Sequence, residues 1–285
     1  MIGERRARYA GYGTRELFVD GRGPKLVLVH GFGHPADCWR PVLQRCERAG
    51  QSAVALDLPG FGAADALAPG LLVPQLVCFL GAAVRHHAGS GSVVLAGNSL
   101  GAVTAVQLLD TVPGVPVGGL VALDMAGAHW APLVRAVARG NWPLLRMLSA
   151  IPAPSRWRVR VADVFAGMVL YGDRRALDRE LVRHLSSQIG NVRSTNSLIE
   201  VGILVKKEVE SLPLPTWIDC PTVIVHGDKD RLVAPATSWE LHAAIPDSRL
   251  LILAGVGHCP HLDTPDTVTA LALDLVAAAG RSETA

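Results

Sequence analysis

The chain has 285 residues, 49% hydrophobic and 18% charged, which is enough for one large domain with a buried core. Its formal net charge of +2, without a basic stripe, argues against a nucleic-acid partner. Five scattered cysteines indicate reduced thiols and not a disulfide framework. No apolar stretch follows the charged N-terminus, so we expect a cytoplasmic protein without stable membrane insertion. We expect it to be a monomer or a homodimer.

Short apolar runs alternate with longer helix-like segments over the first 127 residues. This alternation is the pattern of a mostly parallel sheet covered by helices. The arginines at positions 5, 6 and 8 are interpreted as solvated surface, and the run 17–19 as a first or second strand. Further strands are predicted at 26–29, 53–56, 93–96 and 120–123, and helices at 39–48, 73–87 and 102–109.

The alternation stops between about residues 128 and 212, where prolines and helix-like stretches replace clear buried strands. It resumes with strands at 222–225 and 250–253 and helices at 238–244 and 266–279. We therefore expect a core formed by 1–127 and 213–285, with a helical insertion at 128–212.

The pentapeptide Gly97-Asn98-Ser99-Leu100-Gly101 matches the pattern G-x-S-x-G. A β-branched apolar run precedes it and a helix-like run follows it, which is the strand–turn–helix setting of a nucleophile elbow. Such a turn exposes the Ser99 hydroxyl and directs helix N-terminal amides at charge that develops beside it.

Five landmarks occur in order, each after an apolar strand: 30–33 (HGFG), 57–62 (DLPGFG), the elbow, 227–230 (GDKD) and 257–258 (GH). With them the chain resembles the α/β-hydrolase superfamily, specifically its members with a helical cap. The resemblance implies an α/β fold, a doubly wound and mostly parallel eight-stranded sheet with the cap between the sixth and seventh core strands. Chain order Ser, Asp, His is the order that this fold uses.

The resemblance implies a triad of Ser99, His258 and Asp230. A serine hydroxyl needs a base to take its proton, imidazole titrates near neutral pH, and a carboxylate fixes the imidazole tautomer. Asp228 and Asp124 remain alternative acids, and His261 an alternative base.

The family supplies its oxyanion hole from two backbone N–H groups, here those of Leu100 and Phe32, while His30 anchors the loop of Phe32. The side chains of Phe32, Met125, Trp130 and Trp142 are the candidate substrate pocket. The histidines 226, 258 and 261 with Cys259 fit no zinc pattern, so we expect neither a metal nor another cofactor.

The expected activity is hydrolysis of a small, moderately hydrophobic ester, thioester or lactone through an acyl-enzyme. The loop lacks the His-Gly-Gly-Gly of many lipases, and the elbow has serine where dehalogenases and epoxide hydrolases have aspartate. Asn98 resembles the hydrolases of meta-cleavage products, which cut carbon–carbon bonds, although Cys259 stands where those enzymes usually have tryptophan. That activity and a non-catalytic binding role on the same scaffold stay as alternatives.

Overall fold

The computed structural model describes residues 1–132, 134–135, 155–172, 181–183 and 192–282. One eight-stranded sheet forms its centre, in the order β1-β2-β4-β3-β5-β6-β7-β8. The first two strands run antiparallel to their neighbours and the remaining pairs are parallel. The strands are β1 (Gly3–Tyr9), β2 (Tyr12–Val19), β3 (Arg22–Val29), β4 (Gln51–Leu56), β5 (Val93–Asn98), β6 (Val117–Leu123), β7 (Thr222–Gly227) and β8 (Arg249–Leu253).

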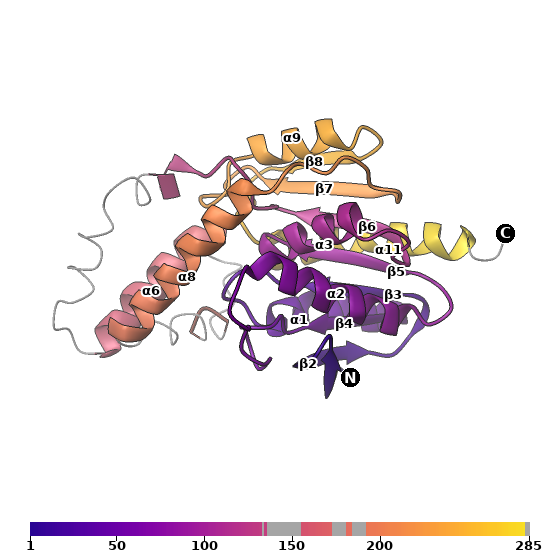
Figure 1. The fold of residues 1–285 in the computed structure, drawn as a ribbon, viewed down its shortest axis with the longest axis horizontal. Coiled ribbons are helices and arrows are strands. Elements are labelled where there is room, and N and C mark those ends of the chain that lie inside the picture. Colours follow the sequence, from indigo (N-terminus) through magenta and orange to yellow (C-terminus); the bar gives the residue numbers. More distant parts are fainter. Residues whose placement is uncertain (133, 136–154, 173–180, 184–191, 283–285) are drawn as a thin grey trace.

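Helices cover both faces of the sheet. The face nearest the viewer in Figure 1 carries α2 (Leu72–Ala88) and α3 (Leu100–Thr111), and α11 (Pro265–Ser282) passes behind the sheet. The same layers also contain η1 (Ala36–Trp39), α1 (Arg40–Ala49), α9 (Ala236–Ala244) and α10 (Pro260–Asp263). The predicted fold class is confirmed.

The central strands are apolar along their length because both of their faces are buried. On β3, Val27 and Val29 join the core cluster of α2 and α3, whereas Leu26 and Leu28 join that of α1 and α11. All four side chains are fully buried. A sheet buried on both faces holds its carboxyl edge rigidly, and the predicted functional loops leave from that edge.

The sequence interpretation missed β1. Its arginines are largely exposed, as expected, but they belong to an edge strand that pairs with β2 from Gly3 opposite Phe18 to Tyr9 opposite Tyr12. Charged side chains protect an edge strand from pairing with other chains, and they also remove the apolar alternation that would reveal it. The other predicted strands are present, most of them a few residues longer than predicted.

Two long helices fall within the predicted insertion, α6 (Ser155–Leu170) and α8 (Val192–Ser211). Both extend beyond the sheet, to the left in Figure 1. A Cβ added at Gly202 of α8 would lie 3.7 Å from the Phe32 ring, so α8 lies over the loop after β3. No helix among the described residues is long and apolar enough to cross a membrane.

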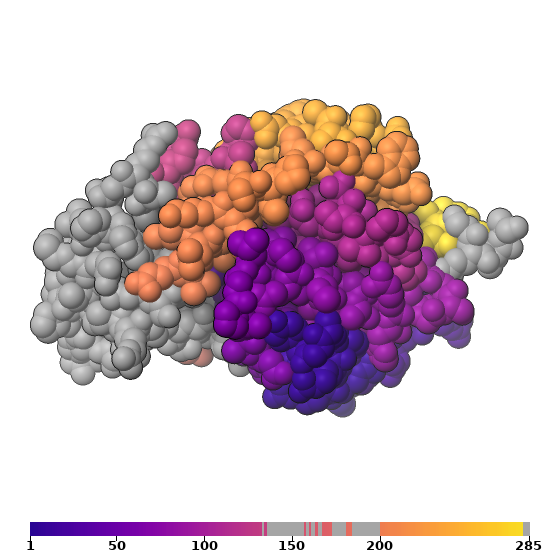
Figure 2. Space-filling view, in the orientation of Figure 1, coloured from indigo at the N-terminus to yellow at the C-terminus, as the bar shows by residue number. Residues whose placement is uncertain are grey.

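The helix α8 is attached to the core through Glu208. Its two carboxylate oxygens accept the backbone N–H groups of Leu72 and Val73 at 2.9 and 2.7 Å. The N-cap of α2, Leu71, provides no side-chain cap, so Glu208 supplies the acceptors that the first turn lacks. Figure 2 shows the C-terminal part of α8, in orange, beside α2, in purple.

We expect Glu208→Ala to lower the free energy of unfolding by about 1 kcal/mol, the typical effect of losing a helix cap. Urea unfolding followed by far-UV circular dichroism measures this change. Glu210→Ala is the matched control, because Glu210 lies on the same helix and forms a surface ion pair with Lys206, its ion-pair partner among the residues that the structure describes. Equal stability of the two variants would contradict the capping role.

Candidate active site

Ser99 lies in the sharp turn between β5 and α3. Its φ of 53° and ψ of −115° are unusual for a side chain that carries a Cβ atom. Such conformations cost about 1–3 kcal/mol and persist only where the surrounding structure imposes them. The strained turn carries the Ser99 side chain at the carboxyl edge of the sheet, with 9% of the residue exposed.

The two flanking glycines allow close approach of the backbone. A Cβ at Gly97 would lie 2.6 Å from the carbonyl carbon and oxygen of Gly101, and one at Gly101 would lie 2.3 Å from the Val29 oxygen. Both distances are shorter than real Cβ contacts. Glycine at 97 and 101 therefore lets the turn close on itself and pack against the end of β3.

The loop 30–33 is held beside the elbow by His30. Its Nε2 accepts the Leu58 N–H at 2.9 Å, so the proton is on Nδ1, which donates to the Gly31 oxygen at 2.8 Å. Burial lowers the pKa of His30 and keeps this imidazole neutral. The anchoring role predicted for His30 fits these contacts, and a Cβ at Gly31 would lie 3.1 Å from the Ser99 Cβ.

Asp57 ties the neighbouring loops together, a role that sequence reasoning did not assign. Its buried carboxylate accepts the N–H groups of Ala36 at 2.6 Å and Ala63 at 2.9 Å, and the Arg15 Nε at 2.9 Å. These bonds join β2 to the loops after β3 and β4. An aspartate after a buried strand and before Pro-Gly was the available signal.

His258 and Asp230 form a direct hydrogen bond. The His258 Nδ1 donates to the Asp230 Oδ2 at 2.7 Å, which leaves Nε2 unprotonated in the neutral ring. The other Asp230 oxygen accepts the N–H groups of Leu232 and Val233 at 2.7 and 3.0 Å. Burial would raise the pKa of Asp230, but the His258 charge and hydrogen bond lower it below its usual range.

Asp124, the alternative acid, lies in the same buried group and shares the His226 ring with Asp230, whose Oδ2 lies 3.5 Å from the His226 Nε2. The Asp124 Oδ1 accepts the Gly227 N–H at 2.9 Å and lies 3.6 Å from the His226 Nε2. Burial and the neighbouring Asp230 raise the pKa of Asp124 well above its usual range. Of the two, Asp230 is therefore the side chain whose charged form is favoured, whereas the surroundings of Asp124 favour its protonated form.

Asn98 joins the elbow to the loop of His258. Its Nδ2 donates to the His258 carbonyl oxygen at 3.0 Å and to the Leu123 oxygen at 3.3 Å. The residue that resembles carbon–carbon bond hydrolases thus has a structural role here, because it fixes the backbone of the candidate base beside the candidate nucleophile.

The other polar candidates have local roles. Asp228, the other alternative acid, accepts the Gly255 N–H at 2.7 Å and so stabilises a turn. His226 contacts the Ser238 hydroxyl at 2.8 Å through Nδ1 and is fully buried. His261 stacks on Trp39 at 4.3 Å between ring centroids, away from Asp230.

Three of the four predicted pocket residues share one apolar cluster. Met125 is buried in it and Phe32 and Trp130 pack against it, together with Val205 and Val209 of α8. Trp142 lies outside the described residues. Met125 also lines a cavity of about 70 Å³ between α3, α8 and α9, but Ser99 does not line it, so this cavity does not mark the acyl site.

Two clusters of described residues have ligand atoms close enough to hold a metal ion. Asp124, Asp230 and His258 form one, and they are accounted for by the hydrogen-bonded pair above. His34, Cys259 and His261 form the other. The sequence pattern argues against Cys259 and His261 as metal ligands and gives His34 no role.

A family model described as the alpha/beta hydrolase family matches residues 26–271. The chain belongs to this family, and it is an enzyme of the hydrolase class. It is 28% identical over 264 residues to a pimeloyl-[acyl-carrier protein] methyl ester esterase of Stenotrophomonas maltophilia (strain K279a), which covers 91% of this chain and 95% of the relative. It is 27% identical over 264 residues to the putative carbamate hydrolase RutD of Escherichia coli O7:K1 (strain IAI39 / ExPEC), over 88% of this chain and 90% of that one.

Among solved structures, the fold is similar to 2-hydroxy-6-oxo-6-phenylhexa-2,4-dienoate hydrolase of Rhodococcus sp. strain RHA1. The TM-score is 0.75 at 18% identity, over 96% of this chain and 98% of that one. At this identity the likeness establishes the fold alone.

We expect Asn98→Ala to reduce kcat about 10- to 100-fold with a smaller change in KM, because small displacements of a catalytic group have effects of this size. Steady-state hydrolysis of p-nitrophenyl esters measures it. Thr269→Ala is the control, since it also removes a side-chain bond to a carbonyl but within α11. Unchanged kcat in folded Asn98→Ala would contradict the positioning role.

Proposed function

We propose that this enzyme hydrolyses small carboxylic esters, thioesters or lactones with Ser99 as nucleophile, His258 as base and the Asp230 carboxylate as the group that orients His258. One observation carries the proposal. The Asp230 carboxylate holds Nδ1 of His258, and Asn98, the residue next to Ser99, holds the backbone of the same histidine. This arrangement supports a serine activated by an oriented imidazole.

In the first half-reaction, Ser99 Oγ would attack the substrate carbonyl while His258 Nε2 accepts its proton. Asp230 stabilises the imidazolium and keeps the ring in its orientation. The Leu100 amide begins α3 and so has no acceptor within the helix, which makes it available for the oxyanion. The Phe32 amide, in the loop that packs against Ser99, is the proposed second donor.

Breakdown of the tetrahedral intermediate would transfer the His258 proton to the leaving alkoxide or thiolate and leave an acyl group on Ser99. A water molecule then gives a proton to His258 and attacks the acyl carbon. The acid leaves and the Ser99 hydroxyl regains its proton. Protons and charges balance without any cofactor.

The apolar lining by Phe32, Met125 and Trp130, beneath α8, supports a moderately hydrophobic acyl group. The methyl ester esterase and the carbamate hydrolase among the relatives support acyl substrates of this class. With the predicted insertion 128–212 acting as a cap, the substrate would enter between cap and core. The cytoplasmic location and the choice between monomer and homodimer stay predictions.

The test is labelling with a fluorophosphonate followed by peptide mass spectrometry. Wild type should gain one adduct on the peptide that contains Ser99, and Ser99→Ala should gain none and lose ester hydrolysis by about 10³-fold or more. Ser238 is an internal control, because its hydroxyl contacts the His226 ring but is fully buried. An adduct elsewhere, or full turnover by Ser99→Ala, would refute the nucleophile.

The two acids can be separated by paired variants. Asp230→Asn should reduce kcat by about 10⁴-fold, because an amide cannot stabilise the imidazolium or hold its tautomer. Asp124→Asn should retain kcat within a few-fold, because a neutral amide of nearly the same shape can still accept the Gly227 N–H and the raised pKa of Asp124 already favours its neutral form. The opposite ranking would make Asp124 the carboxylate that orients His258.

A further inference from the structure

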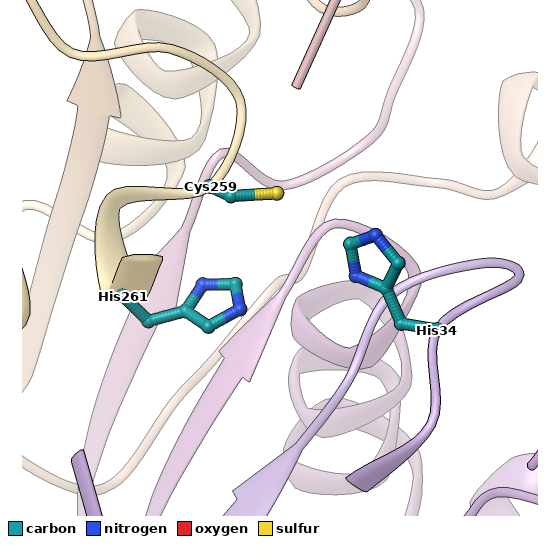
Figure 3. A group of neighbouring side chains, drawn as sticks. All are labelled: His34, Cys259 and His261. Carbon is teal, nitrogen blue, oxygen red and sulfur yellow. The ribbon is translucent and has the colours of Figure 1, made fainter. Parts of the chain in front are cut away.

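A buried cluster of His34, Cys259 and His261 lies beside the candidate active site. Their exposed fractions are 3%, 0% and 0%. Figure 3 shows the three side chains converging, His34 from the loop after β3 and the other two from the segment after β8. One ligand atom from each residue lies within 4.8 Å of the others.

His261 is the unusual member. Neither of its ring nitrogens has a hydrogen-bond partner in the part of the chain that the structure describes. A buried imidazole carries at least one N–H donor, and such a group normally finds a partner. Stacking on Trp39 gives the face of the His261 ring a packing partner, but it provides no hydrogen bond for the ring nitrogens.

We infer that His34, Cys259 and His261 form a binding site for one divalent ion of the zinc class. Imidazole nitrogen and thiolate sulfur are the ligands that Zn²⁺ takes in proteins. Tetrahedral coordination, with bonds of about 2.0–2.3 Å, places ligand atoms roughly 3.3–3.8 Å apart. The ligand atoms, which lie within 4.8 Å of one another, would have to move closer together on binding, and a water molecule would be the fourth ligand.

The protonation states determine how the ion binds. Burial lowers the pKa of His261 well below its usual range, so the imidazole is neutral and able to coordinate. Burial, with Cys38 and Asp124 nearby, raises the pKa of Cys259, so the free site holds a thiol. Binding would replace the S–H bond with an S–metal bond and release one proton to solvent.

The cluster brings together residues from two segments that carry the candidate active site. His34 follows the loop that offers the Phe32 amide, and Cys259 directly follows His258. An ion held by both segments would link the two loops on which the proposed hydrolysis depends. Metal binding itself does not require that activity, so the two proposals fail independently.

The experiment is titration of the full chain with Co²⁺ after EDTA treatment, followed by absorption spectroscopy. One equivalent should produce a thiolate-to-cobalt charge-transfer band and the visible bands of tetrahedral Co²⁺, and Zn²⁺ should abolish them by displacement. Cys259→Ala should lose the charge-transfer band. Cys46→Ala, which removes another fully buried thiol, should retain it.

No band in wild type, or a band that survives Cys259→Ala, would overturn the site. Circular dichroism establishes that each variant is folded. If Cys259→Ala does not fold, His34→Gln and His261→Gln provide the second test, since each should shift the visible bands and weaken cobalt binding. Spectra and affinities unchanged in both histidine variants would also overturn the proposal.

Discussion

The close packing of the elbow against β3 is the constraint on which the rest of the site depends. Gly101 lies so near the Val29 oxygen that no side chain fits between α3 and the strand end. This contact forces the chain to reverse within one residue, and Ser99 takes the strained conformation that results. Because both faces of the sheet are buried, the strain cannot relax by moving β3 or β5.

The loops around Ser99 contain little regular structure and are fixed by buried polar side chains. His30, Asp57 and Asn98 each bind backbone groups from a different segment of the chain. A buried backbone group without a partner costs free energy, so each of these bonds restricts its loop to one arrangement. The candidate catalytic groups are thereby positioned by residues that take no part in the chemistry.

Sequence patterns predicted the core well because its strands are apolar and its landmarks follow strand ends in order. They failed at β1, whose charged residues conceal an edge strand, and they left three candidates for the acid open. The choice among Asp124, Asp228 and Asp230 depends on which carboxylate reaches the His258 Nδ1, a contact across 28 residues that spacing does not encode. The role of His34 was hidden for the same reason, since its neighbours Cys259 and His261 are distant in sequence.

Asp230 and Asp124 are chemically identical side chains, but their surroundings shift their pKa values in opposite directions. Asp230 receives two backbone N–H groups and an imidazole N–H, all of which favour its charged form. Asp124 receives one backbone N–H, and its second oxygen has no hydrogen-bond partner among the described residues. Two carboxylates this close in a buried site resist double ionisation, so the charge is favoured on Asp230, which accepts the larger number of hydrogen bonds. A second charge at Asp124 would compete with Asp230 for the interaction with His258, so the raised pKa of Asp124 favours the proposed orientation of the base.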